Sequence, residues 1–395
     1  MRWIKVKLTD ISKPKQWKNL PISEMSEEGF SVYGANGIIG KYKEYNHEFP
    51  TLAITCRGAT CGTLNITEPK AYITSNAMAL DDISENVNQK FLYYALKKRG
   101  FKDVITGAAQ PQITGEGLSK IVLTIPENLS TQIQIANILS KAETLIEQRK
   151  QSIALLDEFL KSTFLEMFGD PVRNEKGWEK IQLQKIAEIQ GGLQVTSKRE
   201  INTIELPYLR VANVYRNFLD LSVIKKMKVT KEEAKRARLE KDDILIVEGH
   251  GNPNEIGRSS IFDGSIPHCL HQNHLIRVRV DSSYSTPIYV NFFINSPSGK
   301  QQMFKAGKTT SGLNTISSKI VKETIINLPP IELQNQFAAI VSKTEALKEQ
   351  YKSSLQELEN LYGSLSQQAF KGALTFKEEE EAPLMMAAEP DVKYN

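Results

Sequence analysis

Few side chains in this 395-residue chain are spaced as the catalytic groups of an enzyme would be. Gly307-Lys308-Thr309 resembles the end of a phosphate-binding loop, but that motif needs another glycine five residues earlier, where Gln302 stands. Asn327-Leu328-Pro329-Pro330 imitates the Asn-Pro-Pro-aromatic segment of a methyltransferase, but Leu328 separates the asparagine from the prolines. The glycine-rich cofactor loop of such an enzyme is also missing. We therefore predict no catalytic site.

A cluster of possible metal ligands, His268, Cys269, His271 and His274, is close enough in sequence to suggest zinc. Alternation along a strand would place the first three on differing faces, so we interpret them as part of a half-buried strand whose polar face meets DNA or solvent. No metal site is predicted. The odd count of three cysteines favours a reducing compartment over a disulfide framework.

Two segments of the chain predict small α+β domains with the same order of parts. Each has short β-branched or aromatic runs broken by Gly and Asn, then a helix, then a polar loop. In the first segment these parts are strands at 50–55 and 70–74, a helix at 87–98 and a loop at 106–113. In the second they are strands at 243–247 and 274–280, a helix at about 286–295 and a loop at 307–314.

An internal repeat follows these domains. Residues 132–143 recur as 334–345, an offset of 202 that continues to Phe168 and Phe370. Each copy follows a proline and then runs for roughly ten turns without another. Apolar or small residues recur about every 3.5 residues, Leu145 and Leu347 among them, which predicts two long helices with a coiled-coil seam. At about 1.5 Å per residue, a helix of about 38 residues is near 57 Å long, as a spacer would be.

The repeat extends to the start of each domain, where Trp3, Lys5 and Leu8 match Trp178, Lys180 and Leu183. The expected organisation is a duplicated unit: residues 1–128 form the first recognition domain, 129–170 a central helix, 171–328 the second domain, 329–376 a C-terminal helix and 377–395 an acidic disordered tail. The alternative is that the two helices are ordinary packing helices of one α+β protein.

Charge does not decide the function. The formal net charge is +4, and residues 377–395 carry six acidic and two basic side chains, so the positive charge lies before that tail. A modest positive excess fits a polyanion contacted over limited patches, and it also fits proteins that never meet nucleic acid. The N-terminus has no apolar signal region and the chain has no run of about 18 apolar residues, from which we expect a cytoplasmic protein.

The order of domain, helix, domain and helix resembles the specificity subunit of type I restriction-modification systems. The segments that carry the likeness are Gly107-Ala108-Ala109-Gln110-Pro111-Gln112, Asn327-Leu328-Pro329-Pro330-Ile331-Glu332-Leu333-Gln334, residues 207–214 and residues 272–275. The resemblance covers about Trp3 to Leu374. It implies two target-recognition domains held apart by an antiparallel coiled coil, related by a pseudo-twofold axis.

The resemblance also implies partners. A subunit of this family binds double-stranded DNA with a split target, two methyltransferase subunits and two motor-nuclease subunits, which supply all the chemistry. Each domain would read one half-site, and the helices would fix the unread gap. The chain itself would bind no cofactor, because S-adenosylmethionine belongs to the methyltransferase subunits, and ATP and Mg to the motor-nuclease subunits. The methylated adenine must be flipped out of the duplex.

Recognition domains of this family diverge, so the base-reading candidates come from side-chain chemistry and loop placement. Arg, Asn and Gln distinguish base edges in the major groove, while Lys and Arg on phosphates fix position. The candidates in the first domain are Arg57, Asn76, Gln110 and Gln112. Those in the second are Arg210, Asn213, His250, Arg258, Gln272, Asn273, Lys308 and Thr309. For each of them a turn or capping role is the alternative.

Two other function classes stay open at this point. A coiled-coil scaffold could use its paired β-rich domains to bind proteins, and an enzyme would have to transfer a methyl group by itself. Mixing the chain with a methyltransferase subunit and a split DNA site separates these possibilities.

Overall fold

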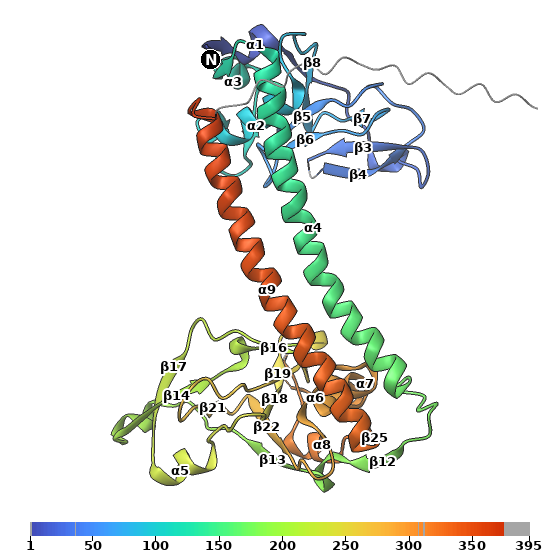
Figure 1. Ribbon diagram of the computed structural model, residues 1–395, viewed down its shortest axis with the longest axis vertical. Coiled ribbons are helices and arrows are strands. Elements are labelled where there is room, and N and C mark those ends of the chain that lie inside the picture. Colours follow the sequence, from blue (N-terminus) through green and yellow to red (C-terminus); the bar gives the residue numbers. More distant parts are fainter. Residues whose placement is uncertain (1, 36, 307, 311–312, 375–395) are drawn as a thin grey trace, which may run out of the picture. The chain divides into compact units, whose positions relative to one another are not determined.

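The computed structural model of the chain is a mixed α+β structure with two sheet-rich parts and two long helices, as predicted (Figure 1). It describes residues 2–35, 37–306, 308–310 and 313–374, with the side chains of residues 304–314 outside that description. The expected acidic tail lies outside the described residues. The chain divides into unit 1, which comprises Met1–Lys150 and the segment from Ser353 onward, and unit 2, which comprises Gln151–Lys352.

Unit 1 is built on a four-stranded sheet of order β2-β8-β5-β6 and a three-stranded sheet of order β4-β3-β7. The strands of the first sheet are β2 (Lys13–Gln16), β8 (Ala77–Asp81), β5 (Leu52–Thr55) and β6 (Leu64–Ile66). Those of the second are β4 (Gly37–Tyr42), β3 (Phe30–Gly34) and β7 (Tyr72–Ile73). Smaller elements complete the unit: β1 (Trp3–Lys7), α1 (Leu8–Ile11), η1 (Ile22–Glu24), α2 (Gln89–Arg99), β9 (Ile105–Thr106), β10 (Gln112–Ile113), α3 (Gly115–Ser119) and β11 (Val122–Pro126).

Unit 2 repeats this plan with sheets of order β13-β22-β18-β20 and β17-β14-β21. Their strands are β13 (Ala187–Gly191), β22 (Leu275–Val280), β18 (Ile244–Val247), β20 (Ser259–Ile261), β17 (Lys225–Val229), β14 (Ile204–Leu209) and β21 (Leu270–His271). The other elements are β12 (Glu179–Gln182), η2 (Leu183–Lys185), η3 (Ser197–Ile201), η4 (Val211–Asn213), α5 (Lys231–Arg236), β19 (Gly249–His250), η5 (Pro253–Glu255), α6 (Pro287–Asn295), α7 (Pro297–Ala306), β23 (Lys308–Thr310), β24 (Leu313–Thr315), α8 (Ser318–Glu323) and β25 (Ile325–Leu328). A hairpin of β15 (Val214–Tyr215) and β16 (Phe218–Leu219) is inserted between β14 and β17, where unit 1 joins β3 to β4 by a short turn.

The long helices α4 (Leu129–Phe168) and α9 (Ile331–Phe370) have 40 residues each. In unit 2 they run antiparallel, because Asp157 lies near Lys348 while Phe164 lies near Phe337. The Lys348 Nζ to Asp157 Oδ1 distance is 2.5 Å, and the Phe164 and Phe337 ring centroids are 5.5 Å apart. Each helix buries its two ends in the hydrophobic cores of the two units: Ile135, Ala136 and Leu139 join the core of unit 1, and Leu160, Phe164 and Phe168 that of unit 2.

A buried glutamine near the start of each helix joins it to the domain before it. Gln132 accepts a hydrogen bond from the Asn88 N–H (2.9 Å) and donates to the carbonyl oxygens of Asn86 (3.0 Å) and Pro126 (2.9 Å). Gln334, the same residue of the repeat, accepts from Ser285 Oγ (2.7 Å) and the Thr286 N–H (2.9 Å) and donates to the Pro329 oxygen (2.8 Å). The repeat therefore preserves a polar anchor as well as an apolar seam.

One detail of the predicted seam is wrong. Leu145 and Leu347 are 42% and 36% exposed, so neither is buried between the helices. Neighbouring positions of a helix point about 100° apart, so Ile146, which fits the same spacing, is half-buried while Leu145 is exposed. In the second copy the buried Thr344 and the largely covered Lys348 flank the exposed leucine.

Neither long helix, nor any other helix in the described ranges, has the unbroken apolar stretch that crossing a membrane requires.

Candidate nucleic-acid interface

Three loops meet at one end of the four-stranded sheet of unit 1. The Cys56 N–H donates to the Asn76 oxygen (3.0 Å), the Ile113 N–H donates to the Cys56 oxygen (3.0 Å), and the Gly58 N–H donates to the Pro111 oxygen (3.0 Å). These bonds join the turn after β5, the turn before β8 and the hairpin β9–β10. We call this set of loops the unit 1 tip.

All four residues predicted for the first domain lie at this tip. Arg57, Gln110 and Gln112 are exposed and Asn76 is half-buried. Within the described part of the chain, their side chains make no hydrogen bond, so their donors and acceptors are available. The hairpin that carries the two glutamines requires a glycine at position 107. Gly107 has a φ of +86°, and a Cβ atom on any other residue there would lie 2.4 Å from the Gln110 oxygen.

The unit 2 tip repeats two of these hydrogen bonds. The Glu248 N–H donates to the His274 oxygen (3.0 Å), and the Ile316 N–H donates to the Glu248 oxygen (2.8 Å). Glu248 therefore corresponds to Cys56, and His274 corresponds to Asn76. The strand pairing agrees with this correspondence, because Ala77 pairs with Thr55 as Leu275 pairs with Val247.

A surface depression of about 540 Å³ lies at the unit 2 tip. Four of the predicted residues line it, Arg210, His250, Arg258 and Gln272, and the structure adds Tyr215 and His274. The Asn252 N–H donates to His250 Nδ1 (3.0 Å), so a neutral His250 carries its proton on Nε2 and can donate from there. Asn273, also predicted, is half-buried in the same turn.

The side chains of two predicted residues are used inside unit 2. Asn213 is buried, accepts from the Arg210 N–H (3.0 Å) and donates to the oxygens of Asp220 (2.7 Å) and Val223 (3.1 Å). It holds the turn after β14 and has no group left for a base. The capping role that was the alternative is the one that the structure gives it.

Arg258 has a 7% exposed side chain and donates to Glu255 Oε2 (3.0 Å) and the Val211 oxygen (3.1 Å). Its guanidinium lies over the Tyr215 ring, 5.0 Å from the centroid. Arg258 therefore supports the floor of the depression and positions Tyr215. The hydrogen bond from Arg258 holds the pKa of the Glu255 carboxyl below its usual value.

The remaining predicted residues, Lys308 and Thr309, lie on β23, which pairs with β24. Their side chains lie outside the described residues.

Sequence reasoning missed Glu248, Tyr215 and His274 as members of the tip. His274 Nδ1 lies 3.4 Å from Glu248 Oε2, and burial raises the pKa of Glu248 while the neighbouring imidazole opposes that shift. His274 lies in the segment interpreted as a half-buried strand facing DNA or solvent, but it is not among the predicted base-reading residues. For Tyr215 the signal was the Arg-Asn turn between two short strands, with Asn217 at φ +58°.

The residues considered for zinc do not gather around one point. Cys269 and His271 are buried, His268 is exposed, and burial raises the pKa of the Cys269 thiol to about 12. In the described ranges no three His, Cys, Asp or Glu side chains are grouped as metal ligands would be.

Comparison with known proteins agrees with this architecture. Residues 2–156 and 175–360 match the family model described as the type I restriction modification DNA specificity domain. The chain is 25% identical over 376 residues to the type I restriction enzyme EcoKI specificity subunit of Escherichia coli K12, covering 90% of this chain and 76% of that protein. It is 24% identical over 371 residues to the StySPI specificity subunit of Salmonella potsdam, covering 89% and 75%.

A solved structure has the same fold. The S subunit of the type I restriction-modification system from M. genitalium matches with a TM-score of 0.62 and 18% identity, over 93% of this chain and 96% of that one.

Proposed function

The chain belongs to the type I restriction-modification DNA specificity family, and we propose that it reads a split DNA target with one half-site assigned to each unit. The observation that carries this proposal is the pair of tips. They share a backbone hydrogen-bond pattern, Cys56 to Asn76 and Glu248 to His274, but present different side chains. A preserved frame with different donors and acceptors is what two readers of different base sequences require.

The chemistry of the tips differs in a way that suits different bases. Unit 1 presents a guanidinium and three carboxamides: Arg57, Asn76, Gln110 and Gln112. Unit 2 presents imidazoles, a carboxylate and a carboxamide around an arginine: His250, His274, Glu248, Gln272 and Arg210. Guanidinium groups suit guanine, carboxamides suit adenine and carboxylates suit the cytosine amino group. The two half-sites should therefore have unlike sequences.

We further propose that two copies of a methyltransferase subunit dock on equivalent surfaces of the helices. Exposed apolar residues recur at the repeat offset: Leu145 (42%) matches Leu347 (36%), and Phe159 (50%) matches Leu361 (50%). Leu145 and Leu361 belong to unit 1, and Phe159 and Leu347 belong to unit 2. Such a repeat gives two identical partners the same apolar contact.

Two variants test this docking. Leu145→Asp with Leu361→Asp should reduce the bound methyltransferase from two copies to one, and so should Phe159→Asp with Leu347→Asp. Leu155→Asp is the control, because Leu155 is 66% exposed but its repeat position is Glu357. Light scattering of the purified complex gives the number of copies. If both pairs of substitutions leave two copies bound, docking uses another surface.

In this proposal the chain has no catalytic role and binds no cofactor. S-adenosylmethionine would be held by the methyltransferase subunits, and ATP and Mg by two motor-nuclease subunits. The helices α4 and α9 each continue from one unit into the other, so their length would set the number of unread base pairs.

The test uses the full chain and its methyltransferase subunit. The complex should protect two short DNA stretches separated by an unprotected gap and should methylate adenine there, while the chain alone should transfer no methyl group. The alternative of a protein-binding scaffold, which the family match does not support, would give neither protection nor methylation. Methyl transfer by the chain alone would contradict the non-catalytic assignment.

A further inference from the structure

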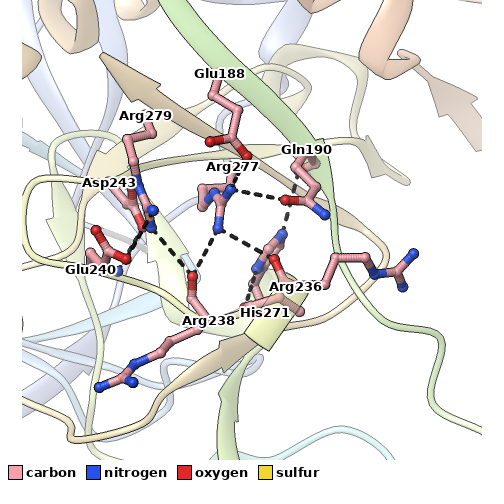
Figure 2. A network of polar contacts seen from close by, with 10 residues as sticks. Glu188, Gln190, Arg236, Arg238, Glu240, Asp243, His271, Arg277 and Arg279 are labelled. Atoms are coloured by element: carbon pink, nitrogen blue, oxygen red, sulfur yellow. Dashed lines mark hydrogen bonds and ion pairs between the residues drawn. The ribbon is translucent and has the colours of Figure 1, made fainter. Parts of the chain in front are cut away.

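A second concave surface of unit 2 lies between β13, β14, α5 and β22. Six of its lining residues carry the argument: Glu188, Lys235, Arg236, Arg238, Arg277 and Arg279. We call it the cationic groove. Behind it is a network of polar contacts centred on Arg277, whose side chain is only 3% exposed (Figure 2).

The network holds one short segment of backbone in place. Arg277 Nη1 donates to the carbonyl oxygens of Arg238 (2.9 Å) and Arg236 (3.5 Å), and His271 Nδ1 lies 3.0 Å from the Ala237 oxygen. Three successive carbonyls are therefore fixed from behind. Figure 2 shows the side chains of Arg236 and Arg238 extending away from this network.

Most carboxylates near the groove are paired with two arginines. Arg277 Nη2 lies 2.5 Å from Glu188 Oε1, and Arg279 binds both oxygens of the buried Asp243 at 2.7 and 2.8 Å. Arg279 Nη1 also lies 3.0 Å from Glu240 Oε1. The two arginines therefore offset two of these three negative charges, and the remaining negative charge together with Glu232 is outweighed by three further cations of the groove.

Three cations of the groove stay unpaired. Lys235, Arg236 and Arg238 are exposed, and none forms an ion pair with a carboxylate in the described ranges. Glu232 is the one lining carboxylate of the described residues that no arginine pairs with. The groove therefore presents a surplus of positive charge on a segment whose backbone is fixed.

The groove and the unit 2 tip lie at opposite ends of β14. Leu206, on β14 at the groove, precedes Arg210, directly after β14 at the tip, by four residues. Four residues of extended chain span about 13 Å, and a duplex advances about 3.4 Å per base pair. A duplex read at the tip could therefore place phosphates at the groove about four base pairs away.

We propose that Lys235, Arg236 and Arg238 bind phosphate oxygens of duplex DNA that continues beyond the half-site assigned to unit 2. This rests on the proposed function, and it adds a contact that reads no base but sets register and affinity.

Unit 1 lacks such a contact. Its counterpart depression is lined by Lys13, Lys15, His47, Asp81 and Asp82. There Lys13 Nζ lies 2.9 Å from Asp82 Oδ2, His47 Nε2 lies 3.0 Å from Asp81 Oδ1, and Lys15 lies over the Trp17 ring at 3.8 Å. These basic side chains already have partners within unit 1. We therefore expect that DNA extending beyond the other half-site adds no binding affinity.

The test compares two duplexes bound by the full chain in its methyltransferase complex. One duplex ends at the half-sites, and the other extends ten base pairs past each. The variant Lys235→Gln/Arg236→Gln/Arg238→Gln should bind the short duplex as the natural chain does. On the long duplex, loss of three phosphate contacts should reduce the slope of log K against log salt by about 2.7, so that the affinity advantage of the natural chain shrinks about 40-fold between 50 and 200 mM salt.

A matched control is Lys180→Gln/Lys185→Gln/Lys322→Gln, which removes three exposed charges of unit 2 outside the groove. It should keep the slope of the natural chain. Extending the DNA on one side at a time should show the effect only past one half-site. If the groove variant keeps the natural slope on the long duplex, or if both extensions contribute equally, the inference is wrong. If the natural chain did not bind the short duplex at all, the proposed function itself would be contradicted.

Discussion

Units 1 and 2 have the same sheets but fill the space between them differently. In unit 1, Ala79 pairs with Ala53 and Ile73 pairs with Tyr33, so the layer is apolar. At the matching places of unit 2, Arg277 pairs with Leu245 and His271 pairs with Leu209, so the layer is polar. The same strand pairing therefore tolerates an alanine or a buried arginine.

The difference shows that the pairing of the strands does not determine whether the side chains between the sheets are polar or apolar. A guanidinium can replace a methyl group only where acceptors surround it, and unit 2 supplies Glu188, Gln190 and two carbonyl oxygens. Unit 1 fills the space with Trp17, which packs against its alanine-rich layer. The carbonyls held by Arg277 are those that position the cationic groove, so the polar interior serves the surface.

The largest effect is expected from Arg277→Ala, which gives unit 2 the residue of unit 1 at that place. It removes a buried side chain and leaves Gln190 Oε1 and the Arg236 oxygen without a donor, while the Arg238 oxygen keeps only a long hydrogen bond of 3.4 Å from Arg279. We expect unit 2 to lose about 3 to 5 kcal/mol, measured as faster hydrogen exchange in unit 2 with unit 1 unchanged. Glu188→Gln is the control, and because Glu188 is 61% exposed it should cost about 1 kcal/mol or less. Equal losses of stability in the two variants would show that Arg277 has no special role in stabilising unit 2.

A pH dependence should distinguish the units next. Burial lowers the pKa of His271 from 6.5 to about 4, so the folded state keeps it neutral. Between these values the unfolded state binds more protons, so stability falls as pH falls from 6.5 to 4, by about 3 kcal/mol in all. Denaturant unfolding across this range should show the loss in unit 2. His271→Ile, the unit 1 residue, should flatten the profile, and an unchanged slope in that variant would assign the effect to another group.

The smallest effect tests where the units agree. Gln132→Ala and Gln334→Ala each remove three hydrogen bonds of a buried side chain. Each should destabilise its own unit by about 2 kcal/mol, because buried donors and acceptors lose their partners. Exposed Gln367→Ala is the control and should change stability little. If only one of the two variants were strongly destabilised, the two glutamines would not have the same structural role in the two units.

The internal repeat and the local residue pattern predicted both long helices, two shorter helices and several strands. The offset of 202 located α4 and α9, and runs of β-branched residues located β5, β18 and β22. The helices expected at 87–98 and 286–295 are α2 and α6, within two residues at each end. Each of these signals is local or repeated, and can be read without knowledge of packing.

The interior of unit 2 could not be predicted in the same way. Arg277 and Arg279 alternate with Ile276 and Val278, which is typical of a strand with one solvent face. In the structure that face packs against a second sheet and α5. The sequence of residues 275–280 alone does not indicate this packing. The prediction that Asn213 reads a base does not hold for a related reason. An asparagine in a loop can either hold a turn or face DNA, and the positions of Asp220 and Val223 decide between these roles.

The most direct test of independent reading is to map methylated adenines across the genome in cells that express single-tip variants. Arg57→Ala/Gln112→Ala should relax the bases recognised in one half-site, and His250→Ala/Gln272→Ala should relax those in the other. In both cases the untouched half-site and the gap should stay as in the natural chain. If either pair of substitutions altered both half-sites, or if both pairs altered the same one, the assignment of one half-site to each unit would be contradicted.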